Sequence, residues 1–262
     1  MIQQLIDLAH QDGVTHEENF PFWLEPEPPA RACVVLVHGF SATPREMRPL
    51  ANTLVAHGFA ALGVRLPGHG TSPEDLSRRS YREWVSTVHA ALDIAGTRAP
   101  RVYAAGLSTG AMTLLAATRT FDLQGMILMA PFLRLQHPLA PFVWILRHLV
   151  HYETRDIEAE LIPFYYARRP LKAIHQLMLL VAKVRRLLPR ITLPALVLTS
   201  KGDQTADYNS AIRLFEQLGS ADKSIEVFED EVPHTLLGDD NPERDRVIQL
   251  CLDFLLERER VR

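Results

Sequence analysis

Hydrophobic and polar positions change their spacing in a regular order along most of the chain. Short continuous apolar runs rich in Val and Leu alternate with longer stretches in which apolar residues recur every three or four positions. The runs are typical of strands buried on both faces, and the longer stretches are typical of amphipathic helices. The predicted strands are 31–37, 59–64, 101–105, 125–129, 195–200 and 225–228, and the predicted helices are 46–57, 81–96, the residues directly after Ser108, 207–218 and a final helix from about Pro242. This order predicts an α/β protein with a doubly wound, mostly parallel sheet.

Residues at the ends of these stretches support the boundaries. Gly58 follows the first predicted helix, where a helix commonly ends on glycine. Asn241 precedes Pro242, so the last helix has a capping side chain and a proline suited to its first turn. Ile2, Leu5, Ile6 and Ala9 recur at helical spacing and predict a short N-terminal helix. The sequence leaves the role of residues 1–18 open.

One long segment interrupts the alternation. Residues 131–190 contain no convincing strand and are rich in Leu, Arg and aromatic residues. Strand and helix resume after Pro189. We therefore expect a core domain made of residues 1–130 and 191–262, with residues 131–190 as a small helical cap inserted into it.

Composition and charge narrow the function classes. The chain has 262 residues, of which 47% are hydrophobic and 23% charged, as in an ordinary globular protein. The formal charge of −3 gives no overall reason to expect a nucleic-acid partner. The charge is uneven, however, because residues 131–190 hold ten Lys and Arg against four Asp and Glu, a local net charge of +6.

The cysteines, the N-terminus and the most apolar window indicate the cellular compartment in which we expect the protein. Cys33 and Cys251 lie far apart inside apolar runs, so we interpret them as buried thiols rather than as a disulfide. The N-terminus lacks the pattern of a secretory signal. The apolar window 139–150 is broken by Pro141 and Arg147 and is too short to span a bilayer. We expect a cytoplasmic protein.

The sequence Gly106-Leu107-Ser108-Thr109-Gly110 is the strongest chemical signal in the chain. It follows a predicted strand and opens an apolar helix, which is the strand-turn-helix setting in which a G-x-S-x-G motif carries a nucleophilic serine. A tight, strained turn exposes the serine, and the flanking glycines leave room for the chain to pass closely. The motif predicts Ser108 as a nucleophile.

A nucleophilic serine needs a base, and the base needs an orienting carboxylate. His234 lies in the polar loop before the last helix, and Asp203 directly follows the strand 195–200. The chain order Ser, Asp, His is the one that this strand-turn-helix arrangement uses. Asp207 is the alternative orienter, although it fits better as a helix cap.

The oxyanion formed during attack on a carbonyl needs preorganised N–H donors. We expect one from the backbone of Thr109, at the start of a helix, and the other from Phe40, in the loop after the first buried strand. Gly39 permits the sharp turn there. We interpret His38 as a structural hydrogen-bonding residue.

At these residues the chain resembles a known family. The stretches His38-Gly39-Phe40-Ser41-Ala42-Thr43-Pro44, Arg65-Leu66-Pro67-Gly68-His69-Gly70 and 106–110 are similar to those of bacterial carboxylesterases and monoacylglycerol lipases of the α/β-hydrolase superfamily. The resemblance covers most of the chain from about residue 31. It implies the α/β-hydrolase fold, Ser108, Asp203 and His234 as the catalytic triad, and the Phe40 and Thr109 N–H groups as the oxyanion hole.

The chain departs from the family pattern at two places. Gln204-Thr205-Ala206-Asp207 follows the acid where a short residue and Val are usual, and Pro233 precedes the histidine where a small or polar residue is common. Neither departure removes a catalytic group, but both bear on the loops that shape the substrate site.

In this superfamily an insertion at this position forms a cap over the nucleophile and shapes the substrate pocket. The apolar stretch here contains Leu139, Phe142, Val143, Trp144, Ile145, Leu146 and Leu149. Most of these side chains are expected to pack the cap onto the sheet. Phe142, Trp144 and Leu146 are the candidate substrate-binding residues, and the positive charge of the segment favours a peripheral contact with an anionic lipid surface. His148 and His151 lack a third ligand, so we expect no metal.

These features together predict a cofactor-independent carboxylic ester hydrolase that cleaves medium acyl esters or monoacylglycerols through an acyl-enzyme intermediate. Acyl transfer, thioester hydrolysis and carbon–carbon bond hydrolysis with the same triad are alternatives, because the fold does not determine the reaction. A ligand-binding protein that has kept the fold is a further alternative. The sequence does not determine the oligomeric state.

Overall fold

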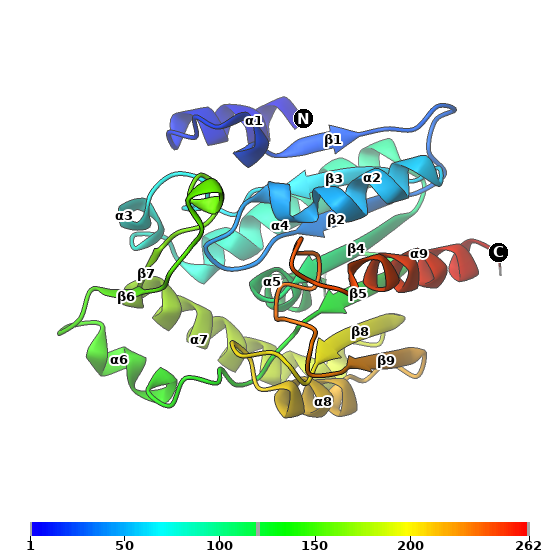
Figure 1. Cartoon of the computed structure of the whole chain (residues 1–262). Coiled ribbons are helices and arrows are strands. Elements are labelled where there is room, and N and C mark those ends of the chain that lie inside the picture. The colour runs from blue at the N-terminus through cyan, green and yellow to red at the C-terminus, as the bar shows by residue number, and fades with distance from the viewer. Residues whose placement is uncertain (1, 119–120, 261–262) are drawn as a thin grey trace.

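A seven-stranded sheet runs through the middle of the molecule (Figure 1). The computed structural model describes residues 2–118 and 121–260. The strands are β1 (Phe22–Leu24), β2 (Cys33–Val37), β3 (Ala60–Val64), β4 (Val102–Leu107), β5 (Gly125–Met129), β8 (Ala195–Ser200) and β9 (Lys223–Phe228). Their order in the sheet is β1-β3-β2-β4-β5-β8-β9, and all neighbours are parallel except β1 and β3. The predicted doubly wound, mostly parallel sheet is confirmed.

Two layers of helices cover the sheet (Figure 1). The helices α2 (Arg48–Ala56) and α9 (Arg244–Arg260) pack on one face, and α4 (Tyr81–Arg98), α5 (Thr109–Ala117) and α8 (Tyr208–Gln217) pack on the other. Successive β2 side chains alternate between two apolar cores, with Val35 in the first and Val34 and Leu36 in the second. A strand between two helical layers must be apolar at every position, which explains its unbroken run of Val and Leu.

Six predicted strands and the predicted helices are present, and the differences have simple causes. The antiparallel strand β1 was not predicted, because three residues at a sheet edge give too short a pattern. The predicted helix 46–57 is divided into a 3-10 turn at Pro44–Met47 and α2. Pro49 lacks an N–H and fits only the first turn of α2, so the α-helix begins beside it. Gly58 ends α2 with a φ of 84°, as expected.

Residues 131–190 lie between β5 and β8 and will be called the insertion. It contains α6 (Val143–Leu146), β6 (Tyr152–Thr154), β7 (Arg168–Pro170) and α7 (Leu171–Leu187), with 3-10 turns at Ala140–Phe142, Ala159–Leu161 and Leu188–Arg190. The expectation of a segment without strands was wrong, because β6 and β7 form a small antiparallel sheet. Each has only three residues, too few for alternation to be visible in the sequence.

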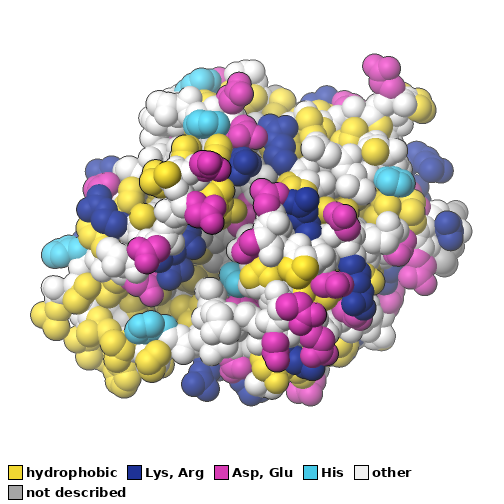
Figure 2. All heavy atoms as spheres, viewed as in Figure 1, with side chains coloured by type: hydrophobic (Ala, Val, Ile, Leu, Met, Phe, Trp, Pro, Cys, Tyr) yellow, Lys and Arg dark blue, Asp and Glu magenta, His cyan; other side chains and the backbone are white. Residues whose placement is uncertain are grey.

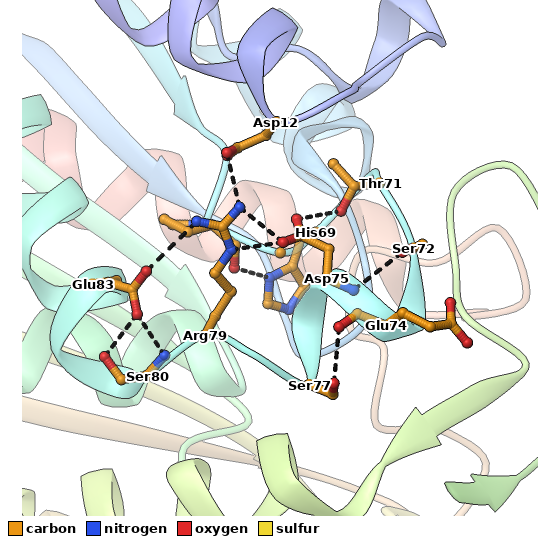
Figure 3. Close-up of polar contacts among 12 residues, drawn as sticks. Asp12, His69, Thr71, Ser72, Glu74, Asp75, Ser77, Arg79, Ser80 and Glu83 are labelled. Atoms are coloured by element: carbon orange, nitrogen blue, oxygen red, sulfur yellow. Dashed lines mark hydrogen bonds and ion pairs between the residues drawn. The ribbon is translucent and has the colours of Figure 1, made fainter.

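The N-terminal segment is tied to the core by charge as well as by apolar contacts. It forms α1 (Ile2–Gln11), whose Leu5 and Ala9 are buried, and a 3-10 turn at Glu17–Asn19. After α1, Asp12 pairs with Arg65 and, at 2.8 Å, with Arg79. Figure 3 shows Asp12 and Asp75 meeting the Arg79 guanidinium beside the short helix α3 (Pro73–Leu76). One carboxylate therefore fastens the N-terminal segment to two loops of the core.

Replacing Asp12 with Asn should destabilise the protein in a pH-dependent way. Burial raises the pKa of the Asp12 carboxyl, but hydrogen bonds and charges from Arg65 and Arg79 outweigh burial and hold the pKa below its usual value. A lowered pKa in the folded state adds stability above the unfolded pKa, and this stability is lost as the pH falls through the folded pKa. We expect urea unfolding to give a loss of about 2 kcal/mol at pH 7, since Arg65 is left buried without its carboxylate. The difference should shrink as the pH falls below about 4, and a difference that stays constant down to the lowest pH at which the protein is folded would contradict the ionic explanation.

Within the part of the chain that the structure describes, no helix is both long enough and apolar enough to cross a membrane.

Candidate active site

Ser108 stands at the sharp turn between β4 and α5. Its backbone has φ 54° and ψ −113°, a conformation that a non-glycine residue adopts only when its surroundings enforce it. The Ser108 N–H donates to the carbonyl of Met129 on β5 at 2.7 Å, and the Ser108 carbonyl accepts from Met112 at 3.1 Å. These two bonds hold the strained turn.

The two glycines of the motif are required by close backbone contacts. A Cβ at Gly110 would lie 2.1 Å from the carbonyl oxygen of Val37 on β2, and a Cβ at Gly106 would lie 2.5 Å from the nitrogen of Ala111. Because these neighbours are backbone atoms rather than flexible side chains, they cannot move aside at low cost. The glycines therefore let α5 approach the sheet and fix the direction of Ser108.

Replacing Gly110 with Ala should destabilise the fold by about 3 kcal/mol, because the new methyl group overlaps the backbone of β2. Gly96 provides a matched control, since it lies within α4 and a Cβ there would meet nothing within 4 Å. Gly96→Ala should stabilise the protein by about 0.5–1 kcal/mol through helix propensity and reduced freedom of the unfolded chain. Urea unfolding of both variants measures the contrast, and equal effects would refute the steric explanation.

The structure brings Ser108, His234 and Asp203 together from three loops. The ring Nε2 of His234 lies 2.9 Å from Ser108 Oγ, and its Nδ1 lies 2.5 Å from Asp203 Oδ2. The Asp203 side chain is 1% exposed and that of His234 is 17% exposed. The carboxylate thus faces one ring nitrogen and the hydroxyl the other, which is the arrangement in which a serine can transfer its proton to the ring.

Both oxygens of the Asp203 carboxylate have partners. While Oδ2 faces His234, Oδ1 accepts hydrogen bonds from the N–H groups of Thr205 and Ala206, each at 2.8 Å. Residues 204–207, where the chain departs from the family pattern, therefore form a turn that holds the Asp203 carboxylate. Asp207, the alternative orienter, caps α8 through the Asn209 N–H and pairs with Arg213 at 3.1 Å. It has no contact with His234 among the described hydrogen bonds.

Phe40 and Thr109 line the same cavity as Ser108. A Cβ at Gly39 would lie 3.7 Å from Ser108 Cβ, so the loop after β2 passes directly beside Ser108. This is where the two expected N–H donors are needed.

His38 has the structural environment that we expected. Its Nε2 accepts the Leu66 N–H at 3.1 Å, so its Nδ1 carries the proton and donates to the Gly39 carbonyl at 2.8 Å. Burial lowers the pKa of His38 to about 4, which keeps the ring neutral near pH 7. The Gly39 carbonyl and the Phe40 N–H belong to one trans peptide unit and point in opposite directions. Anchoring the carbonyl therefore orients the Phe40 N–H.

A cavity of about 610 Å³ opens over Ser108, a volume typical of small-molecule sites. The insertion supplies most of its apolar lining. These apolar residues are Phe132, Leu135, Leu139, Ala140, Val143, Leu146, Val150, Leu171, Ile174 and Leu177. Polar side chains in the wall include Glu46, Arg155 and Tyr165. Among the described residues, no group of three or more His, Cys, Asp or Glu is arranged to hold a metal ion.

The structure corrects part of the expected substrate-binding set. Leu146 lines the cavity, but Phe142 and Trp144 do not, and these two residues are 55% and 56% exposed. The reason is the geometry of a helical turn, in which neighbouring residues point to different sides. Val143 and Leu146, three residues apart, face the cavity together.

Sequence reasoning missed the polar wall of the cavity. In the sequence, Glu46 is the first residue of a predicted helix, and no motif marks Arg155 or Tyr165. Glu46 and Tyr165 share a hydrogen bond across 119 positions of the chain. A contact at that separation has no counterpart in local periodicity, so no signal in this single sequence could have paired them.

Comparisons with known proteins identify relatives of this chain. A family model described as serine aminopeptidase, S33, matches residues 28–163 and 162–241. A thermostable monoacylglycerol lipase of Bacillus sp. (strain H-257) is 29% identical over 238 residues, which are 89% of this chain and 93% of the lipase. A carboxylesterase of Bacillus subtilis (strain 168) is 25% identical over 229 residues, which are 85% of this chain and 91% of the esterase.

Solved structures share the fold. The crystal structure of the monoacylglycerol lipase of Paleococcus ferrophilus has a TM-score of 0.77 with 21% sequence identity, and the match covers 91% of this chain and 98% of that one. A match of this extent shows that the two chains share one fold.

Proposed function

The chain belongs to the serine aminopeptidase S33 family and is a carboxylic ester hydrolase of the α/β-hydrolase type, and we propose that it cleaves medium acyl esters or monoacylglycerols with Ser108, His234 and Asp203 as its catalytic triad. The observation that carries the proposal is the chain of two hydrogen bonds from Asp203 through His234 to Ser108. Ser108 and His234 line a cavity with many apolar residues in its wall.

The proposed reaction has two steps. Ser108 Oγ attacks the ester carbonyl carbon while His234 Nε2 takes the hydroxyl proton, and the electron pair of the C=O bond moves to the oxygen. The Phe40 and Thr109 N–H groups stabilise this oxyanion, and Asp203 stabilises the imidazolium. Collapse of the intermediate breaks the bond to the alcohol, which leaves with the proton from His234. Water then attacks the acyl-enzyme in the same way and releases the carboxylic acid.

The cavity supports an acyl substrate of intermediate length. Apolar side chains of the insertion line the cavity, and Glu46, Gln136, Arg155 and Tyr165 add hydrogen-bonding groups to its wall. An apolar acyl chain and a polar alcohol such as glycerol both find matching surroundings. We propose that the insertion acts as the cap that selects the acyl chain.

The outward side of α6 supports contact with a lipid surface. Phe142, Trp144 and Leu149 are 55%, 56% and 74% exposed, and Figure 2 shows hydrophobic side chains gathered over this region. Large apolar patches on a protein surface often mark binding sites for proteins or membranes. The net charge of +6 on the insertion adds an attraction to anionic headgroups.

Turnover of acyl esters should rise with chain length and then fall. With p-nitrophenyl esters from acetyl to palmitoyl, we expect kcat/KM for octanoyl or decanoyl to exceed that for acetyl by about 100-fold, because full burial of about three to four of the added methylenes, at about 0.8 kcal/mol each, gives this ratio. Leu146→Trp narrows the cavity and should remove this preference without affecting the acetyl ester. Trp144→Ala is the matched control on the outward side, and it should lower turnover only when a monoacylglycerol is presented in anionic vesicles.

Other substrates in the same assay test the alternative activities. Acyl-CoAs test thioester hydrolysis, an added alcohol acceptor tests acyl transfer, and an aminoacyl p-nitroanilide tests the aminopeptidase activity in the family description. A flat chain-length profile, or a preference for one of these substrates over monoacylglycerols, would contradict the proposed substrate class.

We also propose a cytoplasmic location. Cys33 and Cys251 are both free and buried, as expected for a protein of a reducing compartment.

A further inference from the structure

Glu46 contacts the loop of residues 38–41, which carries Phe40 and will be called the oxyanion loop. It lies in the 3-10 turn Pro44–Met47 and lines the cavity. Its Oε2 accepts the N–H of Gly39 at 2.7 Å. The N–H of Gly39 is thus held by Glu46 while its carbonyl is held by His38 at 2.8 Å. Both hydrogen-bonding groups of the residue before Phe40 are fixed by side chains.

The insertion also forms hydrogen bonds that hold the oxyanion loop. Tyr165 donates its O–H to Glu46 Oε1 at 3.2 Å, so the carboxylate joins the insertion to the oxyanion loop. The Tyr166 N–H donates to the Ser41 carbonyl at 3.1 Å, and Arg155 Nη2 donates to Ser41 Oγ at 3.4 Å. Three contacts from the insertion therefore reach the residues around Phe40.

The loop needs this support because its backbone is strained. Ser41 has φ 57°, a left-handed conformation that is unfavourable by about 1–2 kcal/mol for a residue with a side chain. An oxyanion hole accelerates the reaction only if its donors are already in place when the charge develops. A displacement of about 1 Å can reduce the rate about 100-fold.

The Glu46 carboxylate is itself held by the groups that it joins. Burial raises the pKa of Glu46 above its usual value, and the hydrogen bonds from the Gly39 N–H and the Tyr165 O–H, which stabilise the charged form, oppose this shift only in part. Burying this acid in the cavity wall is unfavourable unless both partners are present. Glu46 therefore serves to connect Gly39 of the oxyanion loop to Tyr165 of the insertion, which an apolar side chain could not do.

We propose that Glu46 is a positioning residue of the oxyanion hole and that Tyr165 links it to the insertion, so that docking of residues 155–166 on the loop completes the support that His38 gives to the Phe40 N–H. The inference rests on the proposed function of Phe40 as an oxyanion donor. Its consequence is that the segment that lines the acyl pocket also completes the catalytic machinery.

The test uses Glu46→Ala, Glu46→Gln and Tyr165→Phe in the full chain, with two readouts. The first is kcat and KM for a p-nitrophenyl ester, and the second is the rate at which a fluorophosphonate probe modifies Ser108. We expect Glu46→Ala to lower kcat and the labelling rate about 10–100-fold with KM within about two-fold, because the lost interaction acts in the transition state. Glu46→Gln keeps an acceptor for Gly39 and should stay within about five-fold of wild type. Tyr165→Phe should lower both rates about three- to ten-fold.

A matched control removes a similar hydrogen bond elsewhere. Tyr103 donates to Glu259 at 2.8 Å, away from the cavity lining, and Tyr103→Phe should change neither rate. If Glu46→Ala does not fold, as judged by its thermal melting, Tyr165→Phe decides the question. Wild-type rates in the folded Glu46→Ala or Tyr165→Phe variant, an effect on KM alone, or a Glu46→Gln variant as slow as Glu46→Ala would overturn the inference. A wild-type chain that is labelled but cleaves no ester would refute the proposed function instead, and the labelling rates would still test Glu46.

Discussion

Replacing Ser108 with Ala should lower kcat for ester hydrolysis by about 10⁴–10⁶-fold. The change removes the atom that forms the acyl-enzyme and leaves His234 without the hydroxyl that lies 2.9 Å from its Nε2. The measurement is steady-state hydrolysis of the best ester from the chain-length series, with active-site labelling by a fluorophosphonate as the second readout. The variant should not be labelled.

The fold should survive this substitution, because the Ser108 turn is held by backbone bonds to Met129 and Met112 that alanine also makes. The φ of 54° is unfavourable for alanine and serine alike, so we expect the thermal midpoint to change little. Hydrolysis at the wild-type rate in this variant would refute the proposed nucleophile, and a chain that binds esters without cleaving them in its wild-type form would support the ligand-binding alternative.

The second large effect is expected at the acid. Asp203→Asn should lower kcat by about 10³–10⁴-fold, because an amide cannot stabilise the imidazolium and can place its NH₂ group toward the ring, which favours the wrong tautomer of His234. The loss should be mainly in kcat rather than KM, since the carboxylate acts on the transition state. Its Oδ1 bonds to Thr205 and Ala206 can be kept by the amide oxygen.

Asp207 supplies the matched control for this prediction. It is four residues away, and its carboxylate caps α8 and pairs with Arg213 instead of facing His234. Asp207→Asn should therefore leave kcat within about two-fold of wild type, because an exposed ion pair of this kind contributes little. A larger loss in Asp207→Asn than in Asp203→Asn would mean that the wrong carboxylate has been assigned to His234.

Much of the core could be predicted from the sequence, for a physical reason. A strand buried between two helical layers must be apolar throughout, so β2, β4, β5 and β8 are visible as continuous apolar runs. The order of these strands and helices indicated a doubly wound, mostly parallel sheet, and the family resemblance of the motifs implied the α/β-hydrolase fold, which the structural comparisons confirm. Elements of three residues, such as β1, β6 and β7, left no such pattern.

The insertion was the least predictable part. Its apolar stretch indicated a substrate pocket or a lipid-facing surface, and the structure divides the stretch between the two sides of α6. Leu146 lines the cavity, whereas Phe142 and Trp144 are exposed. The orientation of a single helical turn depends on how the whole segment is docked, which local periodicity over four residues cannot determine.

The sequence by itself determined the identity and chain order of the residues at the candidate site: a serine between close-packed glycines, followed by an acid and a histidine, each after a strand. It could do so because parallel strands bring their carboxyl ends to one edge of the sheet, so that motifs after successive strands must meet there. Only the tertiary structure decided which carboxylate faces His234, which side chains of the insertion reach the cavity, and that Glu46 and Tyr165 join the insertion to the loop of Phe40. These contacts depend on side-chain direction and on docking between distant segments.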